Sequence, residues 1–282
     1  SSLVYYAMGG GLGHLTRARA VLHTLGYEGR VTLISASEHA RDARVVGDCE
    51  VAFVPQGLEC DSRAFVGWIS ATLRAAAADC LCVDTFPAGI LGELSELRAP
   101  GVALWHVARR LRWSRYRTHI TEALHFDRIY VVETLEADHE EYLRAHSATL
   151  ERLCLRDPPS GLATVPLTAA AYWLVIHSGP VAEVEEILAY AAELRALAGA
   201  DVELCVLSPH PPATLPAATR VLNVYPAQSY LAAAARIFSA AGFNTMRECA
   251  PYRAKHTILP MPRRYDDQFE RARQARAPDA RS

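Results

Sequence analysis

The sequence lacks an excess of charge of either sign. Its 29 lysine and arginine residues face 31 aspartate and glutamate residues, a formal charge of -2, and Lys255 is the only lysine. Proteins that hold nucleic acid usually carry a basic surface, and disordered acidic tails need a block of like charges. We therefore predict neither a nucleic acid partner nor a disordered acidic tail.

Three other signals are missing. The seven cysteines are odd in number and include no C-x-x-C pair, which favours free thiols in a reducing cytoplasm over disulfides or zinc. No apolar run approaches the roughly 20 residues of a membrane span, so we predict no integral membrane segment. No signal peptide is visible. The expected location is the cytoplasm, with peripheral attachment to the inner membrane as a variant.

What the sequence does contain is a repeated alternation of strands and helices. It has 282 residues, 51% of them hydrophobic and 21% charged, which suits a globular chain with two cores. Apolar strands that alternate with helical patterns indicate a parallel sheet covered on both faces. Helices are predicted at 63–77, 89–97, 114–124 and 181–197, among others.

The alternation is interrupted once. Prolines, serine and glycine cluster in the segment 158–168, and a strand pattern restarts at Tyr172. Such a break is typical of a domain boundary. We therefore predict an α/β protein with two domains, residues 1–160 and 161–282.

A glycine-rich turn follows the first predicted strand, with the sequence G-G-G-L-G-H from Gly9 to His14. Glycines there allow close backbone approach, and a helix start attracts anions, so Gly11 and Gly13 are candidate ligand contacts. The turn is not a dinucleotide fingerprint, because His14 replaces the third glycine, and it has no Walker lysine. The alternative is a plain turn whose histidine caps the helix.

His14 follows the carboxyl end of one predicted parallel strand and Asp84 is the last residue of another, in the region where α/β proteins bind ligands. A histidine suits general-base catalysis near neutral pH, and a helix start lowers its pKa and keeps it neutral. Asp84 could orient His14, bind an acceptor hydroxyl or cap the next helix.

The second half has two further strand-to-helix turns. Ser178 and Gly179 could donate hydrogen bonds to phosphate, or Ser178 could simply cap a helix whose first residue is Pro180. A later strand runs into a glycine turn and a polar helix start, in which Thr245 and Glu248 have the spacing of a capping box. Asp267 and Gln268 then follow a proline-rich turn, and their side chains suit sugar hydroxyls.

Taken in order, these motifs resemble the GT-B glycosyltransferases. The likeness rests on the glycine turn with His14, the segment D-T-F-P-A-G-I-L-G-E-L at 84–94, A-G-F-N-T-M-R-E at 241–248 and the D-D-Q ending at Gln268. Within the family the sequence is most similar to the group near the peptidoglycan N-acetylglucosaminyltransferase and to related bacterial proteins.

The resemblance implies two Rossmann-like domains whose parallel sheets face each other across a cleft. The first would bind the acceptor, a small or lipid-linked molecule, and the second a nucleotide-sugar, here a UDP-hexose. By position, His14 is the base that activates the acceptor hydroxyl, and Glu248 takes the ribose hydroxyls. The diphosphate would lie at Gly242, Phe243, Asn244 and Thr245, and the donor sugar at Asp267 and Gln268. The family implies neither a cofactor nor a metal. Pro180 departs from it, because the family has a glycine-rich loop there.

Two other functions stay open on the sequence alone. A nucleotide-sugar hydrolase of the same fold would use water in place of the acceptor, and a non-catalytic protein would only bind the nucleotide. His14, Glu248 and Gln268 argue against the second of these.

Overall fold

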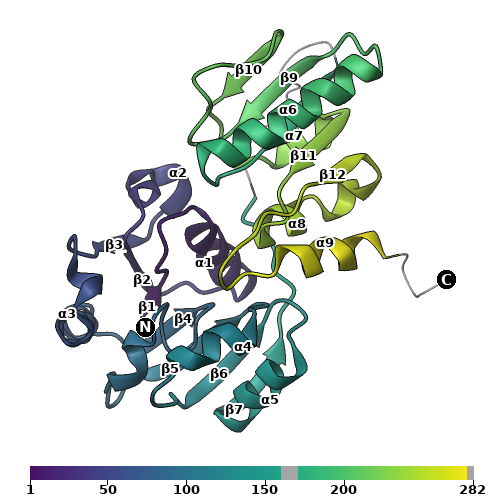
Figure 1. The fold of residues 1–282 in the computed structure, drawn as a ribbon. Coiled ribbons are helices and arrows are strands. Elements are labelled where there is room, and N and C mark those ends of the chain that lie inside the picture. Colours follow the sequence, from purple (N-terminus) through teal and green to yellow (C-terminus); the bar gives the residue numbers. More distant parts are fainter. Residues whose placement is uncertain (160–170, 278–282) are drawn as a thin grey trace. The chain divides into compact units, whose positions relative to one another are not determined.

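The structure is a computed structural model that describes residues 1–159 and 171–277 (Figure 1). The chain forms two compact units. Unit 1 comprises Ser1–Pro158 together with Arg264–Asp266, and unit 2 comprises Pro159–Arg263 and Asp267–Ser282. The predicted boundary at 158–168 lies almost wholly outside the described residues. Among the described helices, none is long and apolar enough to cross a membrane.

Unit 1 is built on a seven-stranded parallel sheet with the order β3-β2-β1-β4-β5-β6-β7. The strands β1 and β4 are adjacent and are buried along their whole length, as the predicted two-sided sheet requires. The chain runs outward from β1 in both directions, so the point between β1 and β4 is where the strand order reverses. The strands are β1 (Ser2–Tyr6), β2 (Arg30–Ser35), β3 (Glu50–Phe53), β4 (Cys80–Asp84), β5 (Ala103–Ala108), β6 (Phe126–Val131) and β7 (Ser147–Arg152).

Two of the helices predicted in unit 1 are shorter than expected. Gly89 and Gly92 have φ values of 84° and 85°, which an α-helix does not allow, so 89–97 contains only the 3-10 turn η3 (Glu93–Glu96). The segment 114–124 yields one helical turn and a 3-10 turn, because the backbone is extended at Ile120. The helical segments are α1 (Gly13–Thr24), η1 (Glu38–Arg41), α2 (Ala43–Val46), η2 (Leu58–Cys60), α3 (Ser62–Ala75), α4 (Trp113–Tyr116), η4 (Arg117–His119) and α5 (Ala137–Ala145).

Unit 2 repeats the plan on a smaller scale. Its five-stranded parallel sheet has the order β10-β9-β8-β11-β12, so the strand order reverses between β8 and β11. Helix α6 spans the residues that the sequence predicted. The strands are β8 (Tyr172–Ile176), β9 (Glu203–Leu207), β10 (Thr219–Leu222), β11 (Arg236–Ser239) and β12 (His256–Ile258); the helices are α6 (Val181–Leu197), α7 (Gln228–Ala233), α8 (Phe243–Glu248), η5 (Ala250–Lys255) and α9 (Gln268–Arg276).

One short segment belongs to a different unit from its neighbours in the sequence. Residues 264–266 are flanked on both sides by unit 2 but are part of unit 1. Tyr265 packs against Phe86 and Tyr116, and its hydroxyl lies 2.6 Å from Nε2 of His119. Its carbonyl also accepts a hydrogen bond of 2.7 Å from the backbone N–H of Arg112. These contacts hold the segment firmly on unit 1.

Candidate active site

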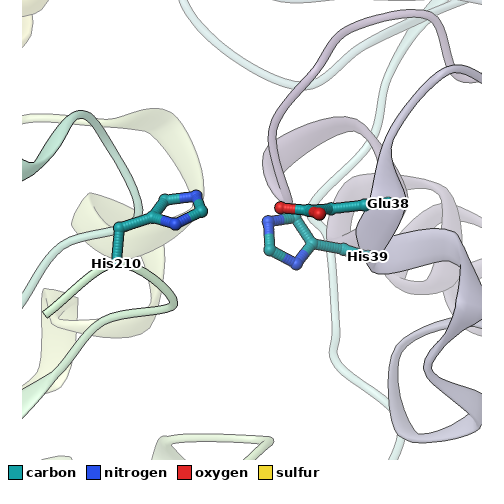
Figure 2. Close-up of side chains that lie close together, drawn as sticks. All are labelled: Glu38, His39 and His210. Carbon is teal, nitrogen blue, oxygen red and sulfur yellow. The ribbon is translucent and has the colours of Figure 1, made fainter.

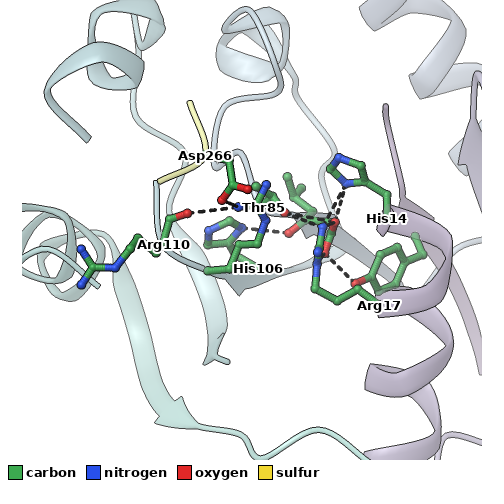
Figure 3. A network of polar contacts seen from close by, with 10 residues as sticks. His14, Arg17, Thr85, His106, Arg110 and Asp266 are labelled. Atoms are coloured by element: carbon green, nitrogen blue, oxygen red, sulfur yellow. Dashed lines mark hydrogen bonds and ion pairs between the residues drawn. The ribbon is translucent and has the colours of Figure 1, made fainter. Parts of the chain in front are cut away.

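The site in unit 1 lies where β1 and β4 end side by side. The chain leaves β1 through the glycine turn, and His14 is the second residue of α1. Asp84 is the last residue of β4. Nδ1 of His14 lies 2.6 Å from Oδ2 of Asp84 (Figure 3). The reversal of strand order thus brings together two residues that are seventy positions apart in the sequence.

The Asp84 carboxylate is fully buried and accepts hydrogen bonds on both oxygens. Oδ1 accepts from the Tyr5 hydroxyl at 3.0 Å and from Nε of Arg17 at 2.8 Å, while Oδ2 accepts from Nη2 of Arg17 at 2.5 Å. Burial by itself would raise the pKa of Asp84, but the charge of Arg17 and the hydrogen bonds from His14 and Arg17 lower it well below its usual range. Asp84 is therefore ionised, and it orients His14 instead of capping a helix.

The hydrogen bond to Asp84 fixes which nitrogen of His14 carries the proton. An ionised carboxylate can only accept, so Nδ1 holds the proton and Nε2 keeps its lone pair. Nη2 of Arg17 lies 3.3 Å from the same Nδ1, and because both are donors this contact is not a hydrogen bond. The imidazole does not cap α1, whose N-cap residue Leu12 has no side-chain cap.

The environment of His14 also keeps the ring neutral. Burial lowers its pKa, the hydrogen bond and charge of Asp84 oppose this, and the charges of Arg17 and Arg109 lower it further. The sequence predicted a lowered pKa from the helix start; the structure gives burial as the main cause. A neutral imidazole with a free Nε2 lone pair can accept a proton at neutral pH.

Gly9 provides the space for this ring. A Cβ added at Gly9 would lie 2.4 Å from Cδ2 and 2.7 Å from Nε2 of His14, so no larger residue fits without moving the imidazole. Gly10 and Gly11, in contrast, have open space where a Cβ would point. Sequence reasoning singled out Gly11 and Gly13, of which Gly13 is the first residue of α1. It did not single out Gly9.

Three more charged residues surround the pair and were not among the predicted site residues. Arg17 is buried and also donates to the Thr85 hydroxyl at 2.7 Å. Arg109 pairs with Asp266 at 2.6 Å, which brings the segment 264–266 into the same network (Figure 3). Arg17 could have been found, because it lies three positions after His14 and therefore on the same face of α1. The pairing of Arg109 with Asp266 has no signal in the sequence.

A second cluster of histidine, carboxylate and arginine lies in unit 2. Nε2 of His177, just after β8, is 2.7 Å from Oε2 of Glu183 in the first turn of α6. Arg263 donates to both oxygens of Glu183 at 2.6 Å. The helix has Pro180 as its N-cap and no side-chain cap, so the alternative in which Ser178 caps the helix is removed. Pro180 precedes the first helical residue, Val181.

The turn at Gly242 also differs in detail from the prediction. Helix α8 begins at Phe243, its N-cap is Gly242, and no side chain caps it. Thr245 therefore lies inside the helix, and the predicted capping box with Glu248 is not formed. The alternative that explained these two residues by capping alone is thus removed.

Asp267 and Gln268 both have structural contacts in unit 2. Asp267 is the N-cap of α9 and accepts from the backbone N–H of Glu270 at 3.2 Å. Gln268 is 4% exposed, and its Oε1 accepts from the backbone N–H groups of Ala241 at 3.1 Å and Met261 at 3.0 Å. The oxygen of Gln268 is thus engaged, and its amide nitrogen is the group that a sugar would have to meet.

Glu38 and His39 project together from η1 (Figure 2). His210, drawn with them, belongs to unit 2. Two ligands from one turn are fewer than the three or four protein ligands of a typical metal site. Among the residues that the structure describes, we therefore assign no metal site to this group.

No family model and no curated protein matches the sequence. Solved structures do match: the spinosyn rhamnosyltransferase SpnG has a TM-score of 0.62 at 16% identity, over 97% of this chain and 83% of that one. The glycosyltransferase SnogD from Streptomyces nogalater has a TM-score of 0.58 at 17% identity, over 92% and 81%. The calicheamicin glycosyltransferase CalG4 has a TM-score of 0.60 at 13% identity, over 96% and 83%.

These matches confirm the predicted fold class: the chain is an α/β protein with two parallel sheets and matches GT-B glycosyltransferase structures. Identities this low establish the fold and not the activity. The structures are natural-product glycosyltransferases, so the finer resemblance to the peptidoglycan group is not supported.

Proposed function

We propose that this protein is a nucleotide-sugar-dependent glycosyltransferase in which His14 is the general base. The observation that carries the proposal is the His14–Asp84 pair, with a protonated Nδ1 and a free Nε2, where the strand order of unit 1 reverses. The GT-B fold supports it, since α/β proteins bind ligands at such points.

The proposed reaction has one proton transfer and one group transfer. The acceptor hydroxyl gives its proton to Nε2 of His14 while its oxygen forms a bond to the anomeric carbon of the donor sugar. The bond from that carbon to the diphosphate breaks, and the nucleoside diphosphate leaves with the bonding electrons. Asp84, already ionised, then stabilises the imidazolium that has formed. A positioned base of this kind contributes about 10²–10⁴-fold to the rate.

We assign the acceptor to unit 1 and the donor to unit 2. The diphosphate would meet the start of α8 at Gly242, Phe243, Asn244 and Thr245. Ser178 and Gly179, in the turn between β8 and α6, would be further phosphate contacts. Glu248 would bind the ribose, and Asp267 and the amide nitrogen of Gln268 the sugar. One structure of the spinosyn rhamnosyltransferase SpnG is a complex with thymidine diphosphate, and another is a complex with the spinosyn aglycone, so both proposed ligand types have a counterpart in a protein of similar fold.

The fold alone does not decide which nucleoside and which sugar the donor carries. The sequence favours a uridine diphosphate hexose, whereas similar structures are named for rhamnosyl and forosaminyl transfer. Calorimetric titration with uridine diphosphate and with thymidine diphosphate separates the two nucleosides. A thermal-shift panel of hexose and deoxyhexose donors then tests the sugar.

Glu248→Ala tests the donor assignment. A hydrogen bond to a charged group is worth about 1.5–3 kcal/mol, so the affinity for the preferred diphosphate should fall roughly ten- to a hundred-fold. Glu186→Ala, on the exposed face of α6, is the matched control and should bind like the wild type. Equal affinity of the wild type and a folded Glu248→Ala protein would remove Glu248 from the site.

His14→Ala tests the base. Turnover should fall by about 10²–10⁴-fold while the affinity for the nucleoside diphosphate stays close to that of the wild type. Lost affinity with full turnover would make His14 a ligand of the diphosphate instead. Assays of the wild type test the two other functions. If the wild type cleaves the donor at full speed without any acceptor, it is a hydrolase. If it binds nucleotides but turns over no donor, it is a non-catalytic protein.

A further inference from the structure

The Arg17 side chain is held in one orientation by the residues around it. It is 2% exposed. Nε donates to Oδ1 of Asp84 at 2.8 Å, and Nη2 donates both to Oδ2 at 2.5 Å and to the Thr85 hydroxyl at 2.7 Å. A guanidinium that meets both oxygens of a carboxylate fixes the plane of that carboxylate as well as neutralising its charge. These hydrogen bonds go to Asp84 and Thr85, so any effect of Arg17 on His14 through them is indirect.

Both effects matter for His14, because Asp84 has two possible states toward it. In one, an ionised Asp84 accepts from Nδ1–H, and Nε2 is free to act as a base. In the other, a protonated Asp84 donates to Nδ1, and the ring proton sits on Nε2, which can then no longer accept one. A buried carboxyl without a positive partner favours its protonated form. Tyr5, the other donor to Oδ1, is neutral and cannot replace the charge of Arg17.

We propose that Arg17 is a positioning residue for the base: its guanidinium holds Asp84 in the orientation and charge state that keep the proton on Nδ1 of His14 and leave Nε2 free. This inference rests on the proposed function only where it calls His14 a base. The tautomer and the charge of His14 are properties of the protein without substrate.

The charged and titratable groups around the ring come from several elements. Asp84 ends β4, Arg17 lies on α1, Tyr5 lies on β1, and Arg109 follows β5. Asp266, paired with Arg109, also favours the charged form of Arg17. Removing the charge of Arg17 takes away a positive charge 3.3 Å from Nδ1 of His14 and leaves the negative charge of Asp84 beside the ring. The His14–Asp84 pair should then bind a proton at a higher pH, whichever of the two residues holds it.

The test is a pH titration of the histidine rings by NMR on protein labelled in histidine, with His14→Gln used to assign the signal. In the wild type the neutral ring should carry its proton on Nδ1. In Arg17→Gln the pair should take up its proton about one to three pH units higher, as expected for the loss of an opposite charge at this distance. Arg19→Gln, on the same helix, is the matched control and should titrate like the wild type.

Arg17→Lys separates charge from orientation and guards against a misfolded Arg17→Gln protein. A lysine keeps the charge but offers a single donor point in place of the fork. The proton should bind near the wild-type pH, whereas turnover should fall at least about ten-fold from the misorientation, with unchanged nucleotide affinity. If the ring of a folded Arg17→Gln protein keeps the wild-type tautomer and titrates at the wild-type pH, Arg17 is only a packing residue and the inference is overturned.

The two proposals fail in different ways. If no donor is turned over by the wild type but the NMR titration shifts as described, the proposed function is lost while the role of Arg17 toward His14 stands. If turnover depends on His14 but Arg17→Gln titrates at the wild-type pH, the proposed function stands and the role of Arg17 is lost.

Discussion

Each unit holds a histidine, a carboxylate and an arginine near the reversal of its strand order, but the two clusters differ in their contacts and in their burial. In unit 1 the histidine meets its carboxylate through Nδ1, and in unit 2 through Nε2. The unit 1 carboxylate ends a central strand and has no exposed surface, whereas Glu183 lies on a helix and is 18% exposed. The arginines differ in the same way, since Arg17 is buried and the Arg263 side chain is 29% exposed.

Under the proposed function, the two clusters would serve different purposes. A carboxylate fixed at the end of a buried strand cannot follow a moving ligand, so the unit 1 cluster suits a base that must be aimed in advance. Glu183 in unit 2 is partly exposed, and so is Arg263, which holds it, so water can reach both groups. The second cluster therefore suits a contact that rearranges when a ligand binds. Three measurements sharpen or break this contrast.

The largest difference should appear when each carboxylate is neutralised. Asp84→Asn leaves Arg17 buried without its paired carboxylate, which costs about 3–5 kcal/mol in the free energy of unfolding. Glu183→Gln should cost about 1 kcal/mol or less, because Arg263 can be solvated. Urea unfolding curves at neutral pH measure both. Equal losses in the two variants would mean that the clusters are energetically alike.

The next difference concerns acid. Burial lowers the pKa of His106 to about 4 and that of His139 to about 3, both in unit 1. A histidine with a lowered folded pKa is protonated more readily in the unfolded chain, so stability is full above pH 6.5 and falls as the pH drops toward the folded pKa. Each of these two histidines should cost about 2–3 kcal/mol at pH 4.5. His256 in unit 2, also with a pKa of about 4, adds to this loss.

One variant isolates the contribution of His139 to this loss of stability. His139 stacks on Trp113 with ring centroids 4.3 Å apart, and His139→Phe keeps an aromatic ring there while removing the titrating group. Comparing melting temperatures at pH 7 and pH 4.5 should show a smaller acid-induced drop in His139→Phe than in the wild type. An identical drop would place the acid sensitivity of unit 1 elsewhere.

The smallest difference is expected from the two glycines that make room for the histidines. A Cβ at Gly9 would lie 2.4 Å from the His14 ring, and one at Gly179 would lie 2.3 Å from Nε2 of His177. Gly9→Ala should lower turnover about ten-fold or more by displacing the base. Gly179→Ala should weaken nucleotide binding instead. Gly10→Ala, with open space at its Cβ, is the control, and a Gly10→Ala protein as impaired as Gly9→Ala would refute the steric explanation.

The architecture was predictable because it depends on local signals. Apolar runs such as β4 are buried on both faces, and the regular spacing of apolar residues marks α1 and α6. The segments that were missed have weaker signals. Helix α5 buries only His139 and Leu143, and β7 is a polar edge strand, so neither shows a clear apolar pattern.

Within the site, the sequence by itself determined which residues stand at the ends of strands, since a parallel sheet sets all of those ends along one edge. That was enough to single out His14 and Asp84. Only the tertiary structure decided that they share a hydrogen bond, that Arg17 pairs with the same carboxylate, and that Asp266 reaches Arg109. The reason is physical: strand order is set by long-range packing, and the charge state of a buried group depends on neighbours that are distant along the chain.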